Sequence, residues 1–205
     1  GGAGDARNAA LPMVQGEYIV FLDCDDTLEL DALEQLSAQI VQTHADVYYF
    51  GMRITDGLRT LAVFSDALPF GEPLTLAGTP ALLLNRPSAC TAIWKRTLFE
   101  STGIRFRAKG WGEDLCMTRK ILSAASSVVV LPEIYYHYLQ HSGSVTNRDQ
   151  LNTNREIMDA LQDLLDWYQT HGLFETYRDE LCKLCIDNVL YDCLLYTSDA
   201  ADDKA

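Results

Sequence analysis

The sequence predicts an α/β fold, in which helices cover a mostly parallel β-sheet and two more helices follow at the C-terminal end. The segment Tyr18–Leu22 is a short apolar run of β-forming residues, typical of a strand buried on both faces. Further strand-like segments then alternate with amphipathic helical segments, as in α/β proteins. The stretch 148–190 has helical periodicity only. A length of 205 residues corresponds to one domain, or to a domain with an appendage.

The N-terminal elements follow from local signals. Residues 1–4 form a glycine-rich loop, and Asp5 can cap a helix over residues 6–14, although Pro12 disfavours helix there. After the strand at 18–22 and a connector at 27–30, Asp31 begins a helix that extends to Thr43. Its apolar side chains lie on one face: Leu33, Leu36, Ile40 and Val41.

A hairpin is predicted next, because Asp56-Gly57 is a turn signal between strand-like segments at 47–54 and 60–64. Short elements follow in this order: loop 66–75, helix 79–84, strand 91–94 and helix 96–101. A longer helix, 113–124, has two acids in its first turn, as the helix dipole favours.

The C-terminal part begins with strands at 128–131 and 134–139, which Pro132 separates. Two amphipathic helices at 148–170 and 174–190 are expected to pack as an antiparallel pair. We divide the chain into a domain at 1–147, a helical extension at 148–192 and a tail at 193–205.

Three carboxylates follow the strand at 18–22 directly: Asp23, Asp25 and Asp26. Ligands of open α/β sheets bind beyond the carboxyl ends of the strands. Acids crowded there repel one another unless a cation or hydrogen-bond donors compensate. The pattern therefore predicts a site for Mg²⁺ or Mn²⁺, shared with a phosphate-bearing substrate. The alternative is a solvated acidic turn that precedes a capped helix.

Composition restricts the classes of partner. The net charge of −13 argues against a nucleic acid, whereas a bound cation can bridge this acidic chain to an anionic substrate. No run approaches 18 apolar residues and no signal peptide is visible, so we expect a cytoplasmic protein without a transmembrane segment. Six cysteines are then expected to be reduced, and Cys182 and Cys185 to be helix-packing residues rather than zinc ligands.

Several motifs occur in a definite order. The first are Gly1-Gly2-x-x-x-Ala6-Arg7-Asn8-x-x-Leu11 and Gly16-Glu17-Tyr18-Ile19-x-Phe21-Leu22-Asp23-x-Asp25-Asp26. Later ones are Trp94-Lys95-Arg96, Gly103-Ile104-Arg105-Phe106, Gly112-Glu113-Asp114 and Tyr136-x-Tyr138 with Gly143-Ser144-Val145-Thr146-Asn147. Over about residues 1–150 this series resembles the family-2 glycosyltransferases. The resemblance implies a partial GT-A fold, which is the Rossmann-like nucleotide-sugar-binding fold of that family.

The resemblance also implies roles for particular residues. Asp23-Cys24-Asp25 matches the Asp-x-Asp motif, which binds a nucleotide diphosphate through a divalent cation. Asp25 is the expected metal ligand, and Asp23 faces the ribose or a metal-bound water. Asp26 serves either the site or the turn. Asp114 matches the catalytic base of inverting members, with Glu113 as its companion; without the family, both acids are explained by the helix dipole alone.

This arrangement fits the chemistry of an inverting, metal-dependent transfer. A carboxylate can take the proton of the acceptor hydroxyl, and a divalent cation can neutralise the leaving diphosphate. The expected donor is a nucleotide sugar such as a UDP-sugar. The expected acceptor is a glycan or a lipid-linked glycan of a bacterial surface polysaccharide. Peripheral contact with the inner face of the membrane is an alternative to a purely cytoplasmic location.

Other candidate residues have more than one interpretation. Arg7 and Asn8 can contact the nucleotide or its phosphates, but Arg7 can equally lie on the surface or pair with the acidic cluster. Trp111 between two glycines can stack on a sugar ring or pack in the core. His137 and His141 are candidates for the late histidine that completes the metal shell in many GT-A enzymes, against a packed or surface role.

The chain departs from the family at both ends. Its glycine loop is at residue 1, so we expect an N-terminally truncated fragment in which the strand at 18–22 lacks partners and which has poor activity alone. The tail, Cys193-Leu-Leu-Tyr-Thr-Ser-Asp-Ala-Ala-Asp202, resembles a translated sequencing adapter, and we expect it to be non-native.

Two other functions stay open at this point. Asp23-x-Asp25-x-Thr27 after an apolar strand also resembles the first motif of haloacid-dehalogenase-type, Mg²⁺-dependent phosphatases, with Asp23 as nucleophile and Asp25 as general acid. That family needs a second acidic pair after a further strand, and no such strand directly precedes Glu113-Asp114. The third possibility is a non-catalytic domain that binds sugar nucleotides.

Overall fold

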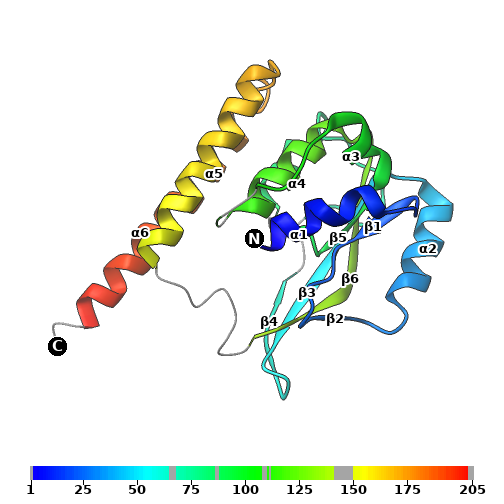
Figure 1. Cartoon of the computed structure of the whole chain (residues 1–205), viewed down its shortest axis with the longest axis horizontal. Helices are drawn as coiled ribbons and strands as arrows, with labels where there is room; N and C mark the ends of the chain where they lie inside the picture. The colour runs from blue at the N-terminus through cyan, green and yellow to red at the C-terminus, as the bar shows by residue number, and fades with distance from the viewer. Residues whose placement is uncertain are drawn as a thin grey trace.

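The computed structural model describes residues 2–64, 68–85, 88–107, 110, 112–140 and 150–202, and it shows a mixed α/β architecture (Figure 1). The strands are β1 Tyr18–Val20, β2 Thr27–Leu28, β3 Val47–Thr55, β4 Thr60–Phe64, β5 Ala92–Lys95 and β6 Val128–Leu139. The α-helices are α1 Ala3–Ala10, α2 Ala32–Thr43, α3 Arg96–Thr102, α4 Glu113–Ala124, α5 Gln150–Thr170 and α6 Arg178–Asp202. Two 3₁₀ helices, η1 Leu11–Met13 and η2 Pro80–Leu84, complete the described elements.

The described strands form one sheet with neighbours in the order β1, β5, β3, β6, β2, and β4 pairs with β3. Only β3 and β6 run parallel; the pairs β1–β5, β3–β5, β3–β4 and β2–β6 are antiparallel. The prediction of a mostly parallel sheet is therefore wrong for the strands that the structure describes. Apolar periodicity indicates which side chains are buried, but it carries no information about the direction of the neighbouring strand.

Strand β1 is shorter than predicted and is not buried on both faces. Ile19 is buried, Tyr18 and Val20 on either side of it are half-buried, and Leu22, beyond the strand, is 49% exposed. The strand lies at one end of the sheet and pairs with β5. An unbroken apolar run is compatible with this position too, because an exposed leucine or valine costs little.

Residues 128–139 form the single strand β6 rather than two strands. Along its pairing with β3, Tyr49 faces Val130 whereas Gly51 faces Ile134, so β6 contains extra residues at this point. Pro132 is one of them and is exposed. The register shift accommodates a residue that has no backbone N–H to donate, which explains how the strand continues through proline.

The core lies between the sheet and the surrounding helices, and Figure 1 shows α1, α3 and α4 gathered near one end of the sheet. Its largest fully buried side chains include Trp94, Tyr48, Phe99, Leu82 and Met117. Helices α2, α3 and α4 agree with the predicted segments, and α1 begins earlier than predicted, at Ala3. Pro12 lies in η1, after α1 has ended.

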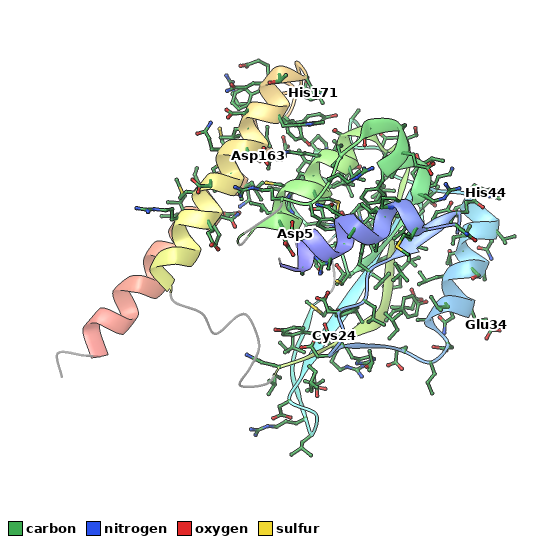
Figure 2. The ribbon with its side chains drawn as sticks, in the orientation of Figure 1. Asp5, Cys24, Glu34, His44, Asp163 and His171 are labelled. Carbon is green, nitrogen blue, oxygen red and sulfur yellow. The ribbon has the colours of Figure 1, made fainter. Side chains whose placement is uncertain are left out.

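The C-terminal helices pack against α4 and η2 and thus share the core of the preceding part. Tyr168 of α5 is fully buried and donates a hydrogen bond to the Arg119 carbonyl at 2.9 Å. Asp163 lies on the side of α5 that faces α4 (Figure 2), where it accepts from Lys120 at 2.8 Å. Helix α6 returns alongside α5 (Figure 1), as predicted for an antiparallel pair. The predicted boundary at residues 147–148 lies outside the described residues, so the division into domains stays a prediction.

No helix among the described residues is long and apolar enough to cross a membrane.

Candidate functional site

The acidic turn follows β1 and faces the helices α1 and α4. Phe21 anchors its beginning, because this ring packs edge-on against Phe99 and Phe106 at centroid distances of 6.1 and 5.1 Å. The Asp26 N–H donates to the Asp23 carbonyl at 3.1 Å, which closes the turn. Cys24 lies exposed at this turn (Figure 2), Asp25 is exposed, and the Asp23 side chain is 42% exposed.

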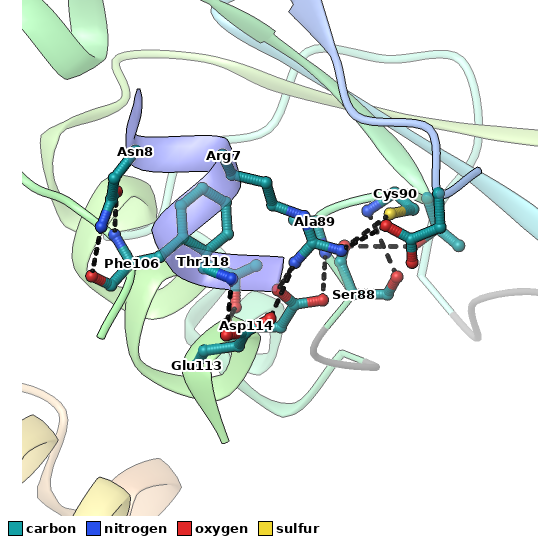
Figure 3. A network of polar contacts seen from close by, with 12 residues as sticks. Arg7, Asn8, Ser88, Ala89, Cys90, Phe106, Glu113, Asp114 and Thr118 are labelled. Carbon is teal, nitrogen blue, oxygen red and sulfur yellow. Dashed lines mark hydrogen bonds and ion pairs between the residues drawn. The ribbon is translucent and has the colours of Figure 1, made fainter. Parts of the chain in front are cut away.

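Arg7 of α1 connects the acidic turn to the first turn of α4. Figure 3 shows its guanidinium among the carboxylates, with Nη2 2.8 Å from Asp23 Oδ1 and Nη1 2.8 Å from Asp114 Oδ1. The same Nη1 lies 3.2 Å from Glu113 Oε1. The guanidinium also lies 5.2 Å from the centroid of the Phe106 ring, an arrangement that favours a cation. Three predicted site residues, Asp23, Glu113 and Asp114, thus all contact a fourth, Arg7.

Two glycine residues position the first turn of α4 against α1: Gly112, directly before α4, and Gly4 in α1. Gly112, which begins the helix, has φ +82°, a left-handed conformation that other residues rarely adopt. The Gly4 N–H donates to Glu113 Oε2 at 2.9 Å. A Cβ on Gly4 would lie 2.5 Å from this oxygen and 2.6 Å from the Arg107 carbonyl oxygen. Only glycine therefore allows α1 to approach this closely.

Among the residues that the structure describes, each oxygen of the Asp114 carboxylate has one hydrogen-bond partner. Oδ1 accepts from Arg7, and Oδ2 accepts from the Ala89 N–H at 3.0 Å. The Asp114 side chain is 21% exposed. Because a carboxylate oxygen has two lone pairs, each retains one for a further proton or donor.

Burial and charge shift the ionisation of this cluster. Desolvation by burial raises the pKa of Asp114 above the ordinary range of aspartate, although the Arg7 charge opposes this. Burial and the neighbouring Asp114 likewise raise the pKa of Glu113, again against the effect of Arg7. Burial lowers the pKa of Arg7, but the surrounding acids outweigh it and hold Arg7 in its charged form. Glu113 and Asp114 therefore bind protons more readily than free carboxylates do.

Asp26 faces inward, unlike Asp25. Its carboxylate is buried, accepts from the Tyr136 hydroxyl and accepts from the Leu139 N–H at 2.8 Å. Of the two roles predicted for Asp26, these contacts favour the turn. Burial raises its pKa, because desolvation outweighs the two hydrogen bonds.

Asn8 uses both ends of its amide within the protein. Its Nδ2 donates to the Phe106 carbonyl at 2.8 Å, and its Oδ1 accepts from the Phe106 N–H at 2.9 Å (Figure 3). This pairing attaches α1 to the segment before α4. Because both ends of the amide are used, the geometry gives no support to a contact between Asn8 and a nucleotide. Trp111 and His141 lie outside the described residues. His137 lies beside Glu29, with 2.9 Å between Nε2 and Oε1.

Sequence reasoning missed Ala89, Cys90 and Tyr136. Cys90 is buried with its sulfur 3.5 Å from Arg7 Nη2, and burial raises the pKa of its thiol, which disfavours a nucleophilic role. Ala89 and Cys90 belong to no motif. Tyr136 begins the Tyr136-x-Tyr138 motif, but the motif assigned it no contact with the acidic turn.

The fit to a divalent cation rests on few ligands. Within the part of the chain that the structure describes, no three His, Cys, Asp or Glu residues are grouped as a metal site. Magnesium is commonly bound through one or two carboxylates together with substrate phosphates and water. The exposed carboxylate of Asp25 and the half-exposed one of Asp23 match this donor set.

Residues 1–100 match the model of a family described as "Glycosyl transferase family 2". The chain is therefore similar to this family over its first 100 residues, which include the acidic turn at the end of β1. The reported matches give no support to the phosphatase interpretation of this turn.

Curated family-2 proteins resemble the chain over most of its length. It is 29% identical over 140 residues to the poly(ribitol-phosphate) β-N-acetylglucosaminyltransferase TarS of Staphylococcus aureus, covering 67% of this chain and 23% of TarS. It is 26% identical to glycosyltransferase GlyA of Streptococcus pneumoniae, over 79% of this chain and 24% of GlyA. It is 30% identical to the succinoglycan biosynthesis protein ExoO of Rhizobium meliloti, over 84% of this chain and 52% of ExoO. The chain thus spans about a quarter of the length of the first two.

Solved structures confirm the predicted GT-A fold. The crystal structure of S. aureus TarS 1-349 in complex with UDP has a TM-score of 0.60 and 23% identity, covering 80% of this chain and 44% of that one. The UDP-GlcNAc complex of the same protein has a TM-score of 0.59 and 24% identity, over 87% of this chain and 55% of that one.

Proposed function

We propose that the protein transfers a sugar from a UDP-sugar to a hydroxyl group of a glycan or lipid-linked acceptor, with inversion at the anomeric carbon and with a divalent cation. The contact that carries the proposal is the Arg7 bridge, because it holds Asp23 and Asp114 oxygens each 2.8 Å from one guanidinium. An Asp-x-Asp turn and a carboxylate on a neighbouring helix are the two groups that such a transfer needs. The UDP and UDP-GlcNAc complexes of TarS support the choice of donor.

On the donor side, Asp25 and Asp23 would hold Mg²⁺ or Mn²⁺ against the diphosphate. Bound there, the cation would act as a Lewis acid that stabilises the negative charge on the leaving UDP. The protein contributes an exposed Asp25 and a turn held at its start by Phe21. Arg7, next to Asp23, supplies a further positive charge beside this turn.

On the acceptor side, Asp114 would be the general base. As the acceptor hydroxyl attacks the anomeric carbon, its proton passes to a free lone pair of the Asp114 carboxylate. The Arg7 and Ala89 donors fix the orientation of this carboxylate during the transfer. Because burial raises the pKa of Asp114, the carboxylate is a stronger base than an exposed aspartate. Glu113 shares Arg7 and shapes the same charge environment.

The names of the relatives support a place in surface polysaccharide synthesis. TarS is named for action on poly(ribitol-phosphate), and ExoO for succinoglycan biosynthesis. We therefore propose a polymeric or lipid-linked glycan as acceptor and a reaction in the cytoplasm, beside the inner face of the membrane.

Substitution of Asp114 by asparagine tests the proposal. In the full-length protein, Asp114→Asn is expected to lower kcat for sugar transfer by about 10²–10⁴-fold, because the general base is lost. Binding of UDP with Mn²⁺, measured by calorimetry, should persist. Asp166→Asn, which alters an exposed acid of α5, is the control and should leave both quantities unchanged.

Transfer that survives Asp114→Asn would reject this residue as the base. A wild-type protein that binds UDP with neither transfer nor hydrolysis would instead support a non-catalytic sugar-nucleotide-binding domain. A phosphoenzyme formed at Asp23 would contradict the transferase altogether.

A further inference from the structure

The hydroxyl group of Tyr136 lies behind the acidic turn and contacts both of its ends. Tyr136 is in β6 and only 2% exposed. The Tyr136 hydroxyl donates to Asp26 Oδ2, and its oxygen accepts from the Asp23 N–H at 3.4 Å. One buried side chain therefore joins the first and the last residue of the turn that carries Asp25.

The tyrosine itself is held by the sheet. Tyr136 pairs with Leu28 of β2 on one side and with Met52 of β3 on the other. Three residues further along β6, the Leu139 N–H donates to the second Asp26 oxygen at 2.8 Å. The turn is thus fastened to β6 at two points, in addition to its own bond from Asp26 N–H to the Asp23 carbonyl.

This arrangement determines where the exposed carboxylates point. Asp26 is turned into the protein by Tyr136 and Leu139, while Asp25, the preceding residue, stays exposed. Side chains that orient metal-binding groups without contacting the metal commonly change affinity when they are altered. The Tyr136 hydroxyl is too deeply buried to be a ligand itself, and burial raises its pKa, so it stays a protonated donor.

We propose that Tyr136 is a positioning residue for the cation and diphosphate, acting through the backbone of Asp23 and the carboxylate of Asp26. This inference rests on the proposed function, since it concerns the same site. The role differs from that of Arg7, which donates to the carboxylate of Asp23 rather than accepting from its backbone N–H.

The test compares two buried tyrosines. Tyr136→Phe removes the hydroxyl and keeps the ring. Tyr48→Phe is the matched control, because the fully buried Tyr48 hydroxyl also accepts a backbone N–H, from Ala45 at 2.8 Å, and contacts Thr43. Tyr48 packs against Tyr18, where β1 begins, whereas the acidic turn follows its end. Both variants should lose stability, so their unfolding temperatures are measured first.

The decisive quantity is the affinity for Mn²⁺ in the presence of UDP, measured in the full-length protein by electron paramagnetic resonance of free Mn²⁺. Tyr136→Phe is expected to weaken this affinity by about 10–100-fold, whereas Tyr48→Phe should leave it unchanged. At saturating Mn²⁺ the pH profile of kcat should match that of the wild type, because Asp114 is untouched.

Three outcomes would overturn the inference. If both variants have the wild-type affinity, Tyr136 only stabilises the fold. If both weaken it equally, the effect is general loss of stability. If the wild type itself does not bind Mn²⁺ with UDP, the proposed function fails and this inference fails with it. Should Tyr136→Phe not fold, Asp26→Asn, which removes the carboxylate that the tyrosine contacts, is expected to weaken the affinity in the same way, and unchanged affinity there would refute the role.

Discussion

Arg7 is the residue on which the geometry of the candidate site depends most. Its side chain is 11% exposed and faces three carboxylates with one positive charge. Such a cation is strongly stabilised, but it cannot neutralise all three acids at once. The raised pKa values of Asp114 and Glu113 are consistent with this imbalance, since burial and the mutual repulsion of the acids exceed the effect of Arg7.

Removal of the Arg7 charge should shift the pH dependence of transfer. Arg7 lowers the pKa of Asp114, so Arg7→Met, which keeps an unbranched apolar stem beside Phe106, is expected to raise that pKa further. The base is active only when deprotonated, and the acidic limb of kcat/KM against pH should therefore move to higher pH, by about one unit or more. At pH values below this limb, Arg7→Met should transfer sugar more slowly than the wild type.

The control for this experiment is Arg59→Met, because Arg59 is 80% exposed and pairs only with Asp56 among the contacts that the structure describes. Its acidic limb should coincide with that of the wild type. A limb that stays in place in Arg7→Met would mean that a group other than Asp114 or Glu113 governs the profile.

The residues of this cluster were predictable one by one, but their contacts were not. The resemblance singled out Asp23 and Asp114, and an ion pair was one of three alternatives for Arg7. Arg7 and Asp114 are 107 positions apart in the chain, and a single sequence contains no signal for a contact at that separation. The Ala89 N–H is a backbone group, which no motif can indicate.

At the scale of elements, the docking of α1 decides whether Arg7 and the first turn of α4 meet. Gly4 makes this possible, because its missing side chain leaves room for Glu113 and for the Arg107 carbonyl. Asn8, one turn later on α1, pairs with the backbone of Phe106. Helix α1 is therefore fastened at two points to the segment that leads into α4.

Gly4→Ala should undo this docking. A backbone carbonyl at 2.6 Å from the new Cβ cannot move aside as a flexible side chain can, so a loss of about 1–3 kcal/mol in the free energy of unfolding is expected. Urea unfolding monitored by circular dichroism measures it. Transfer activity should fall as well, since the Gly4–Glu113 hydrogen bond is broken.

Gly2→Ala is the matched substitution at the start of the same helix, where nothing lies within 4 Å of the new Cβ. It should cost about 0.5 kcal/mol, the difference between glycine and alanine at a helix N-cap. A loss in Gly4→Ala no larger than that in Gly2→Ala would show that close approach does not set the requirement for glycine at position 4.

The elements themselves were largely predictable, whereas their neighbours were not. Amphipathic periodicity gave α2 and α4, and the turn signal Asp56-Gly57 gave the β3–β4 hairpin. The direction of β1 against β5 was missed because a long segment joins them, and such a connection allows either direction. Pro132 predicts the end of a strand. The strand continues because of a register shift against β3, a distant strand whose position a local sequence pattern does not indicate.

For the whole molecule, charge sets the condition for binding a diphosphate. The chain has a net charge of −13. Three carboxylates of the candidate site, Asp23, Glu113 and Asp114, share the charge of Arg7, and Asp25 lies in the same turn as Asp23. A nucleotide diphosphate brings further negative charge. Without a cation, this repulsion should weaken its binding.

Removal of divalent ions should therefore weaken UDP binding and prevent transfer. Calorimetry in EDTA is expected to show at least a tenfold weaker affinity for UDP, corresponding to about 1.4 kcal/mol, and added Mn²⁺ or Mg²⁺ should restore it. Uridine, which lacks the diphosphate, is the control ligand and should bind equally with and without EDTA. Tight, EDTA-resistant binding of UDP would exclude a metal-dependent mechanism.

Two backbone amides of the site have a practical use in spectroscopy. The Gly4 N–H donates to Glu113 alone, and the Ala89 N–H donates to Asp114 alone among the carboxylates that the structure describes. In a ¹⁵N-labelled sample, the chemical shift of each amide should follow the protonation of its own carboxylate. Two neighbouring acids whose titrations overlap in any kinetic profile can thus be followed separately, each through one resolved nuclear signal.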